Sequence, residues 1–155
     1  MDLLALRLGE PERLPRQQAV REAFLKDARP VGGADLLQLS PADLETLFGL
    51  CDAAFFAGEL GRRCGSTLQF SLNRSLRTSA GVTRWNRRTG EKSIEIAADL
   101  LKRSFRKKGE PQLVNGLPCA DRLAAMTRVF EHELCHLAEI LERDRSSCRG
   151  RPFKG

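Results

Sequence analysis

The sequence predicts an α+β domain in which a small antiparallel three-stranded sheet packs on helices, with a long helix near the C-terminus. Two observations carry this prediction. Apolar and polar residues alternate with a period of two in the middle of the chain, and apolar residues recur every three or four positions before and after it. A length of 155 residues suits a single domain with a hydrophobic core.

Residues 1–38 contain several prolines, a glycine pair and charges of both signs. We interpret them as an N-terminal extension or linker with a docking helix over 16–27, whose weak apolar side consists of Val20, Phe24 and Leu25. Residues 39–155 form the expected domain.

The domain is expected to begin with a core helix. Ser40 suits the N-cap position and Pro41 the first helical position, apolar residues follow at helical spacing, and Gly58 provides a stop.

Three strands are expected next. Residues 68–72 alternate between apolar and polar, and residues 80–85 and 93–97 flank a turn sequence at 86–90, which is typical of a hairpin. Asp99 is expected to cap a short helix, and residues 106–118 to form a charged break followed by loop.

The last helical pattern runs from Asp121 to Leu141 and contains both histidines of the chain, in the motif His132-Glu133-Leu134-Cys135-His136. Such an H-E-x-x-H arises by chance in fewer than about one chain in a hundred of this length. The helical wheel puts both histidines at the border of the apolar stripe and points Glu133 into it.

Residues four apart lie on one face of a helix, so the two imidazoles can share one Zn²⁺ ion. Glu133 would then act as the general base that takes a proton from the metal-bound water. A buried carboxylate is costly unless a nearby charge such as a dication compensates it. The alternative is a purely structural helix with two rim histidines and an ion-paired glutamate.

The chain resembles the SprT-like metalloprotease domain, the family that includes the DNA–protein crosslink protease Spartan. The resemblance covers residue 40 to the end, and its segments are 47–60, Ser79-Ala80-Gly81-Val82-Thr83, Ile94-Glu95-Ile96-Ala97 and 129–137. It implies a zincin-like fold with the metal-binding helix near the C-terminus. It also implies a zinc-dependent peptidase that acts on proteins bound or crosslinked to DNA through a basic surface.

The sequence departs from this family at the third metal ligand. The family has a histidine there, followed by glycine and then phenylalanine, whereas aligning Gly150 and Phe153 puts Arg149 in its place. Arginine stays protonated and does not bind zinc. Cys148 is the nearest residue that could substitute as a thiolate ligand. A ligand from beyond residue 155, if the chain is a fragment, is an equal alternative.

The formal net charge is +6, which favours acidic partners, and the basic residues are concentrated in the middle third of the chain. Arg84, Trp85, Arg87 and Arg88 are the candidate nucleic-acid-binding residues, with Trp85 able to stack on a base at the expected hairpin. The alternative is a solvated basic face with Trp85 in the core.

The remaining features bear on location. Apolar runs stay well short of the roughly 18 residues of a membrane span. The five cysteines form no C-x-x-C pair, which indicates reduced thiols, and the N-terminus does not resemble an export signal; we expect an intracellular protein, nuclear or cytoplasmic.

Three functions stay open from the sequence: a zinc peptidase working near DNA with a protein substrate, a SprT-like DNA- or protein-binding module whose metal site is degenerate, and a zinc hydrolase with a non-protein substrate. The oligomeric state does not follow from the sequence.

Overall fold

The structure is a computed structural model that describes residues 2–5, 8–76, 79–97, 99, 112–114 and 117–144. Its principal helices are α1 (Glu10–Ala28), α2 (Pro41–Phe56), α3 (Glu59–Cys64) and α5 (Arg122–Arg143). The short 3₁₀ turns η1 (Leu3–Ala5), η2 (Gly33–Asp35) and η3 (Gly65–Thr67) connect or precede them. The strands are β1 (Leu68–Leu72), β2 (Gly81–Trp85), β3 (Lys92–Ile96), β4 (Gln112–Val114) and β5 (Leu117–Cys119).

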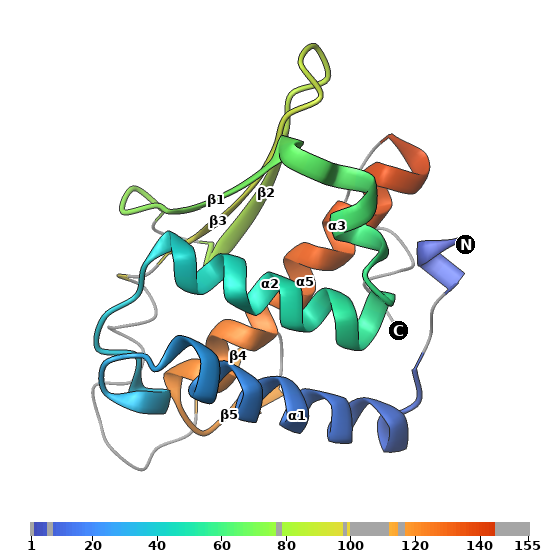
Figure 1. Cartoon of the computed structure of the whole chain (residues 1–155). Coiled ribbons are helices and arrows are strands. Elements are labelled where there is room, and N and C mark those ends of the chain that lie inside the picture. The colour runs from blue at the N-terminus through green and yellow to red at the C-terminus, as the bar shows by residue number, and fades with distance from the viewer. Residues whose placement is uncertain are drawn as a thin grey trace.

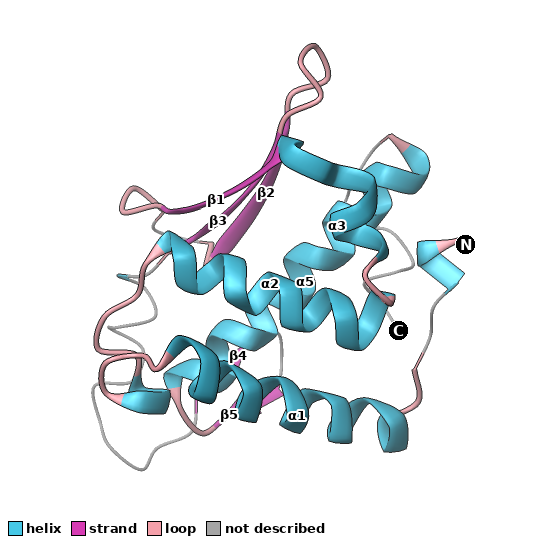
Figure 2. Ribbon diagram, viewed as in Figure 1, coloured by secondary structure: helices cyan, strands magenta, loops and turns pink. Residues whose placement is uncertain are grey.

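The elements form layers (Figure 1). The sheet of β1, β3 and β2 lies on one side of α2 and α5, with β1 against α2 and β2 against α5, and α1 lies on the other side of α2. Figure 2 shows the same arrangement of a small sheet on a larger set of helices. The expected α+β class is therefore confirmed.

The prediction that all three strands are antiparallel is wrong. The strand order is β1-β3-β2; β2 and β3 pair antiparallel as the expected hairpin, but β1 pairs parallel to β3. The central strand β3 supplies Ile94 and Ile96, both fully buried. Period-two alternation identifies a strand but does not encode which neighbour it pairs with or in which direction.

Residues 112–119 also differ from expectation. In place of the loop expected up to Pro118, β4 and β5 pair antiparallel in a separate two-stranded sheet. The short helix expected after Asp99 and the basic run at 106–108 lie outside the described residues.

The helix expected within residues 1–38 is present, and it begins earlier, at Glu10. Val20 is 3% exposed and Phe24 is fully buried, in the same cluster as core residues of α2 and α5. The guanidinium of Arg21 bonds both carboxylate oxygens of Asp121, at 3.0 and 2.6 Å. α1 is therefore an integral part of the core.

The two helix starts expected from sequence are confirmed. Ser40 and Asp43 form a reciprocal capping box at the start of α2: the Asp43 amide donates to Ser40 Oγ, and the Ser40 amide donates to the Asp43 carboxylate. Asp121 caps α5 by accepting the Ala124 amide at 2.9 Å. Asp121 thus fixes both the start of the motif-bearing helix and its link to α1.

Candidate metal centre

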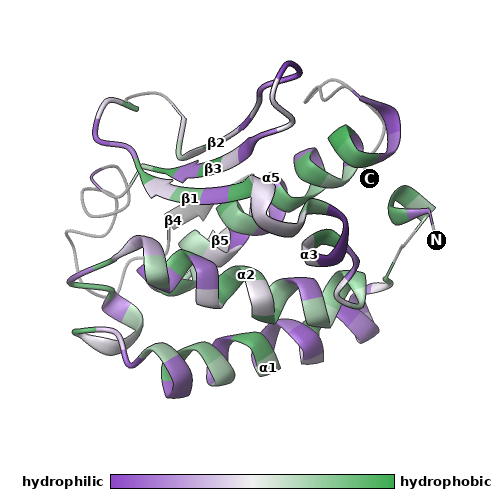
Figure 3. Ribbon diagram, turned by 45° about the horizontal axis from the view of Figure 1, so that its top comes forward, coloured by the Kyte–Doolittle hydropathy of each residue, from purple (hydrophilic) through white to green (hydrophobic). Residues whose placement is uncertain are grey.

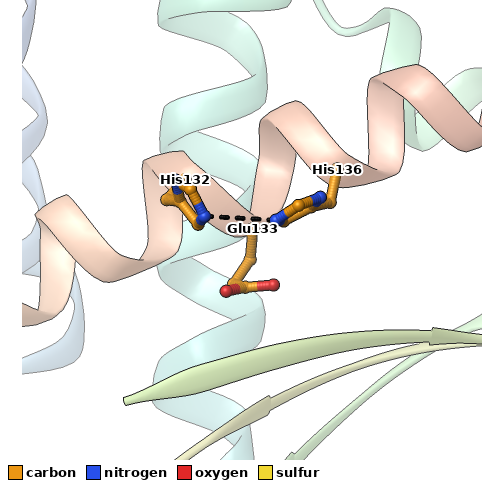
Figure 4. A group of neighbouring side chains, drawn as sticks. All are labelled: His132, Glu133 and His136. Atoms are coloured by element: carbon orange, nitrogen blue, oxygen red, sulfur yellow. Dashed lines mark hydrogen bonds between the residues drawn. The ribbon is translucent and has the colours of Figure 1, made fainter. Parts of the chain in front are cut away.

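The motif lies in the middle of α5, and its two histidines extend from the same side of the helix (Figure 4). Their Nε2 atoms are 3.1 Å apart, and the rings are nearly perpendicular. Without a metal, this distance suits a hydrogen bond between one protonated and one unprotonated Nε2. The expected convergence of His132 and His136 is present.

The same spacing fits zinc. With Zn–N bonds of about 2.0–2.1 Å, nitrogens 3.1 Å apart subtend roughly 95–102° at the metal, close to the tetrahedral angle of about 109°. A ligand oxygen of Glu133 and the two histidine nitrogens all lie within 4.8 Å of one another. The three side chains are thus a group that could hold a metal ion.

Burial favours the neutral form of both histidines. Desolvation lowers the pKa of His132, and desolvation together with the neighbouring His132 lowers the pKa of His136, although Glu139 opposes this shift. A pKa below the ordinary value of about 6.5 keeps the imidazole neutral at pH 7. Neutral imidazole is the form that binds a metal.

Glu133 is 4% exposed, which agrees with the expected inward direction, and it points from α5 towards the sheet (Figure 4). Burial raises the pKa of its carboxyl, and a hydrogen bond from Thr83 acts in the opposite direction. The Thr83 hydroxyl lies 2.6 Å from Glu133 Oε2. General bases are typically found in this kind of environment, where a buried carboxyl group has a raised pKa and lies beside two neutral histidines.

β2 contributes two residues beside Glu133, Gly81 and Thr83, that were not among the predicted site residues. Gly81 packs so closely on α5 that a Cβ at this position would lie 3.2 Å from Glu133 Cγ and 2.8 Å from Val129 Cγ1. The sequence predicts residues 80–85 as a strand but not its contact with Glu133. Its period of two already puts Gly81 and Thr83 on one face of the strand.

The polar side of α5 is largely covered by other elements. Gln17 of α1 donates to both carboxylate oxygens of Glu131 at 3.1 Å. Glu142 accepts the Leu3 amide at 2.9 Å and pairs with Arg63 of α3. Glu139 of the same helix is buried, at 5% exposed.

The third ligand is not among these groups. Cys148, its candidate, and Arg149 lie outside the described residues. Among the residues that the structure describes, His132, Glu133 and His136 form the one metal-compatible group of three or more His, Cys, Asp or Glu side chains. The described part of the chain therefore supplies two histidines that could serve as metal ligands.

The candidate nucleic-acid-binding residues lie at the β2–β3 turn, whose tip is hydrophilic in Figure 3. Arg84 pairs with Glu95 across the hairpin. Arg87 lies over the Trp85 ring, 5.1 Å from its centroid, and bonds the Asp144 carbonyl at 3.1 Å. Arg88 is exposed, and Trp85 is half-buried rather than part of the core. Arg87 thus covers one face of Trp85, whereas Arg84, the neighbouring residue of the strand, points to the opposite face of the sheet.

Comparisons with known proteins do not identify a family for this chain. The chain matches no protein-family model, no curated protein and no solved structure. The resemblance to the SprT-like domain thus depends on the residues quoted for it.

Two further findings concern the described residues as a set. None of their helices is long and apolar enough to cross a membrane. Cys51, Cys64 and Cys135 are free thiols, and burial raises the pKa of Cys135 to about 11.

Proposed function

We propose that this chain is a zinc-dependent peptidase of the SprT-like type that cleaves proteins bound or crosslinked to DNA. The observation that carries the proposal is the convergence of the His132 and His136 Nε2 atoms, 3.1 Å apart, beside the buried carboxylate of Glu133. A structural helix requires neither two converging imidazoles nor an inward glutamate between them.

Each residue has a distinct role in this proposal. His132 and His136 would hold the ion through Nε2. Zinc bound there would polarise the peptide carbonyl and lower the pKa of a water molecule to about 7. Glu133 would be the general base that accepts a proton from water and returns it to the leaving amine. Burial keeps the pKa of Glu133 raised, which suits a group that must both accept and return a proton near neutral pH.

The DNA part of the proposal is supported by the basic hairpin. Arg88 and Arg87 are exposed at its tip, and Trp85 presents an aromatic ring beside them. Exposed arginines neutralise phosphates, and an aromatic ring stacks on bases irrespective of sequence. An intracellular location, nuclear or cytoplasmic, is part of the same proposal.

A Glu133→Gln variant tests the mechanism. It keeps the shape of the side chain and loses the base, so we expect zinc content to be unchanged and cleavage of histone or casein, with and without single-stranded DNA, to fall by at least about a hundredfold. Undiminished cleavage by this variant would show that Glu133 is not the base.

The second candidate function is a DNA- or protein-binding module with a degenerate metal site. Arg149 favours it, because arginine stands where the family's third histidine is expected. Zinc analysis of the wild type and of a Cys148→Ser variant separates the two functions. A binding module would bind DNA without stoichiometric zinc. A peptidase in which Cys148 is a metal ligand would lose zinc in the Cys148→Ser variant. A zinc hydrolase with a non-protein substrate would bind zinc and leave histone and casein intact.

A further inference from the structure

Two residues of β2 contact the Glu133 side chain. Gly81 and Thr83 are two positions apart, so they face the same side of the strand, towards α5. The Thr83 hydroxyl lies 2.6 Å from Glu133 Oε2 and 3.2 Å from the Glu133 main-chain carbonyl oxygen. A Cβ at residue 81 would lie 3.2 Å from Glu133 Cγ and 3.3 Å from Oε1.

The Thr83 hydroxyl has one proton to donate. The contact to Oε2 is the shorter of the two and its acceptor carries charge, so the proton goes to Oε2. Threonine is also stiff at χ1, because it is β-branched. One carboxylate oxygen is therefore held from the sheet, and the other is left to accept a proton.

Such restraint matters for a glutamate more than for most groups. Its side chain has three rotatable bonds, and ordering it costs up to about 1.5–2 kcal/mol of rotamer entropy. A general base must also bring its oxygen within roughly 2.6–3.2 Å of the proton it takes. α5 fixes only the Cα of Glu133, so the position of the carboxylate depends on what surrounds it.

We propose that Thr83 is the positioning residue of the candidate base: its hydroxyl holds Glu133 Oε2 so that Oε1 receives the proton of the attacking water. Gly81 provides the space beside the carboxylate that this arrangement needs. The inference rests on the proposed peptidase function.

Kinetics of Thr83→Val and Thr83→Ser test it. Valine keeps the shape and removes the hydroxyl, and we expect kcat to fall about tenfold to a hundredfold at nearly unchanged KM and zinc affinity, the range that a small misplacement of a catalytic group produces. Serine keeps the donor and should restore kcat to within a few-fold of wild type. Thr46→Val is the matched control, because the Thr46 hydroxyl donates to the Ala42 carbonyl within α2.

A double-mutant cycle gives a readout that needs no activity. Unfolding of the zinc-free chain is measured for Thr83→Val, for Glu133→Met, which removes the acceptor at similar volume, and for the two together. We expect the unfolding equilibrium constants to reveal a coupling of about tenfold, as for a hydrogen bond to a charged group.

The outcomes are distinct. Wild-type kcat in Thr83→Val, or a loss of zinc that parallels its loss of activity, overturns the positioning role and leaves the peptidase function standing. Additive effects in the cycle show that Thr83 does not hold Glu133. A wild-type chain that cleaves no protein removes the proposed function and the catalytic role of Thr83 together, whereas the coupling still reports on the contact.

Discussion

Replacing Gly81 by alanine should destabilise the chain and disturb the candidate base at the same time. The new Cβ would lie 2.8 Å from Val129 Cγ1 and 3.2 Å from Glu133 Cγ, both well inside ordinary van der Waals contact. Val129 cannot rotate away easily, because a valine in a helix strongly prefers one χ1 rotamer. β2 must therefore move away from α5, or Glu133 must shift.

The magnitude follows from two opposing effects. Overpacking a well-packed site costs about 1–3 kcal/mol. Gly81 has an ordinary strand conformation, so alanine recovers about 0.4–1 kcal/mol by restricting the unfolded chain. We expect a net loss of about 1–2 kcal/mol in the free energy of unfolding, together with a lower kcat that reflects displacement of the carboxylate.

Urea denaturation measures this change as a shift in the midpoint at constant slope. Gly49→Ala is the matched control: Gly49 is exposed in α2, and a Cβ there would meet nothing within 4 Å. Alanine in a helix interior should stabilise the chain by about 0.5–1 kcal/mol. A Gly81→Ala variant as stable and as active as wild type would show that β2 does not pack tightly on α5 at this position.

Three further outcomes are expected. Asp121→Ala should lower the free energy of unfolding by at least about 1 kcal/mol in thermal or urea melts, because it removes the cap of α5 and the partner of Arg21. The free energy of unfolding of the zinc-free chain should fall as the pH drops below about 6.5. The reason is that both histidines have lowered pKa values in the folded state, so they bind protons more readily in the unfolded chain. A His132→Ala/His136→Ala variant should show a smaller fall. Arg88→Ala should weaken DNA binding in a salt titration, reducing the slope of log K against log salt by about 1, with no change in melting temperature; an unchanged slope would place Arg88 outside the interface.

The sequence predicted the local structure of the site well. Helical spacing located α5, and the same periodicity pointed Glu133 inward and brought the two histidines together. These features depend on the backbone of one helix alone, so a pattern within one segment is enough to encode them.

Features that need two segments were harder to predict. The parallel pairing of β1 with β3 and the contact of Thr83 with Glu133 both depend on how distant elements pack. The pairing of β4 with β5 did have a local signal, because the sequence Asn-Gly at 115–116 is typical of two-residue hairpin turns. Three-residue strands, however, are too short for alternation to be visible. α1 packs on the core although its apolar face is narrow. The contact is made by Val20, which is 3% exposed, and Phe24, which is fully buried.

The central claim is that His132 and His136 hold one zinc ion. Its most direct test is the zinc content of the purified chain after dialysis, measured beside a His132→Ala/His136→Ala variant. The account predicts about one zinc per wild-type chain and almost none in the variant. A wild type without zinc, or a variant that retains it, would contradict the account.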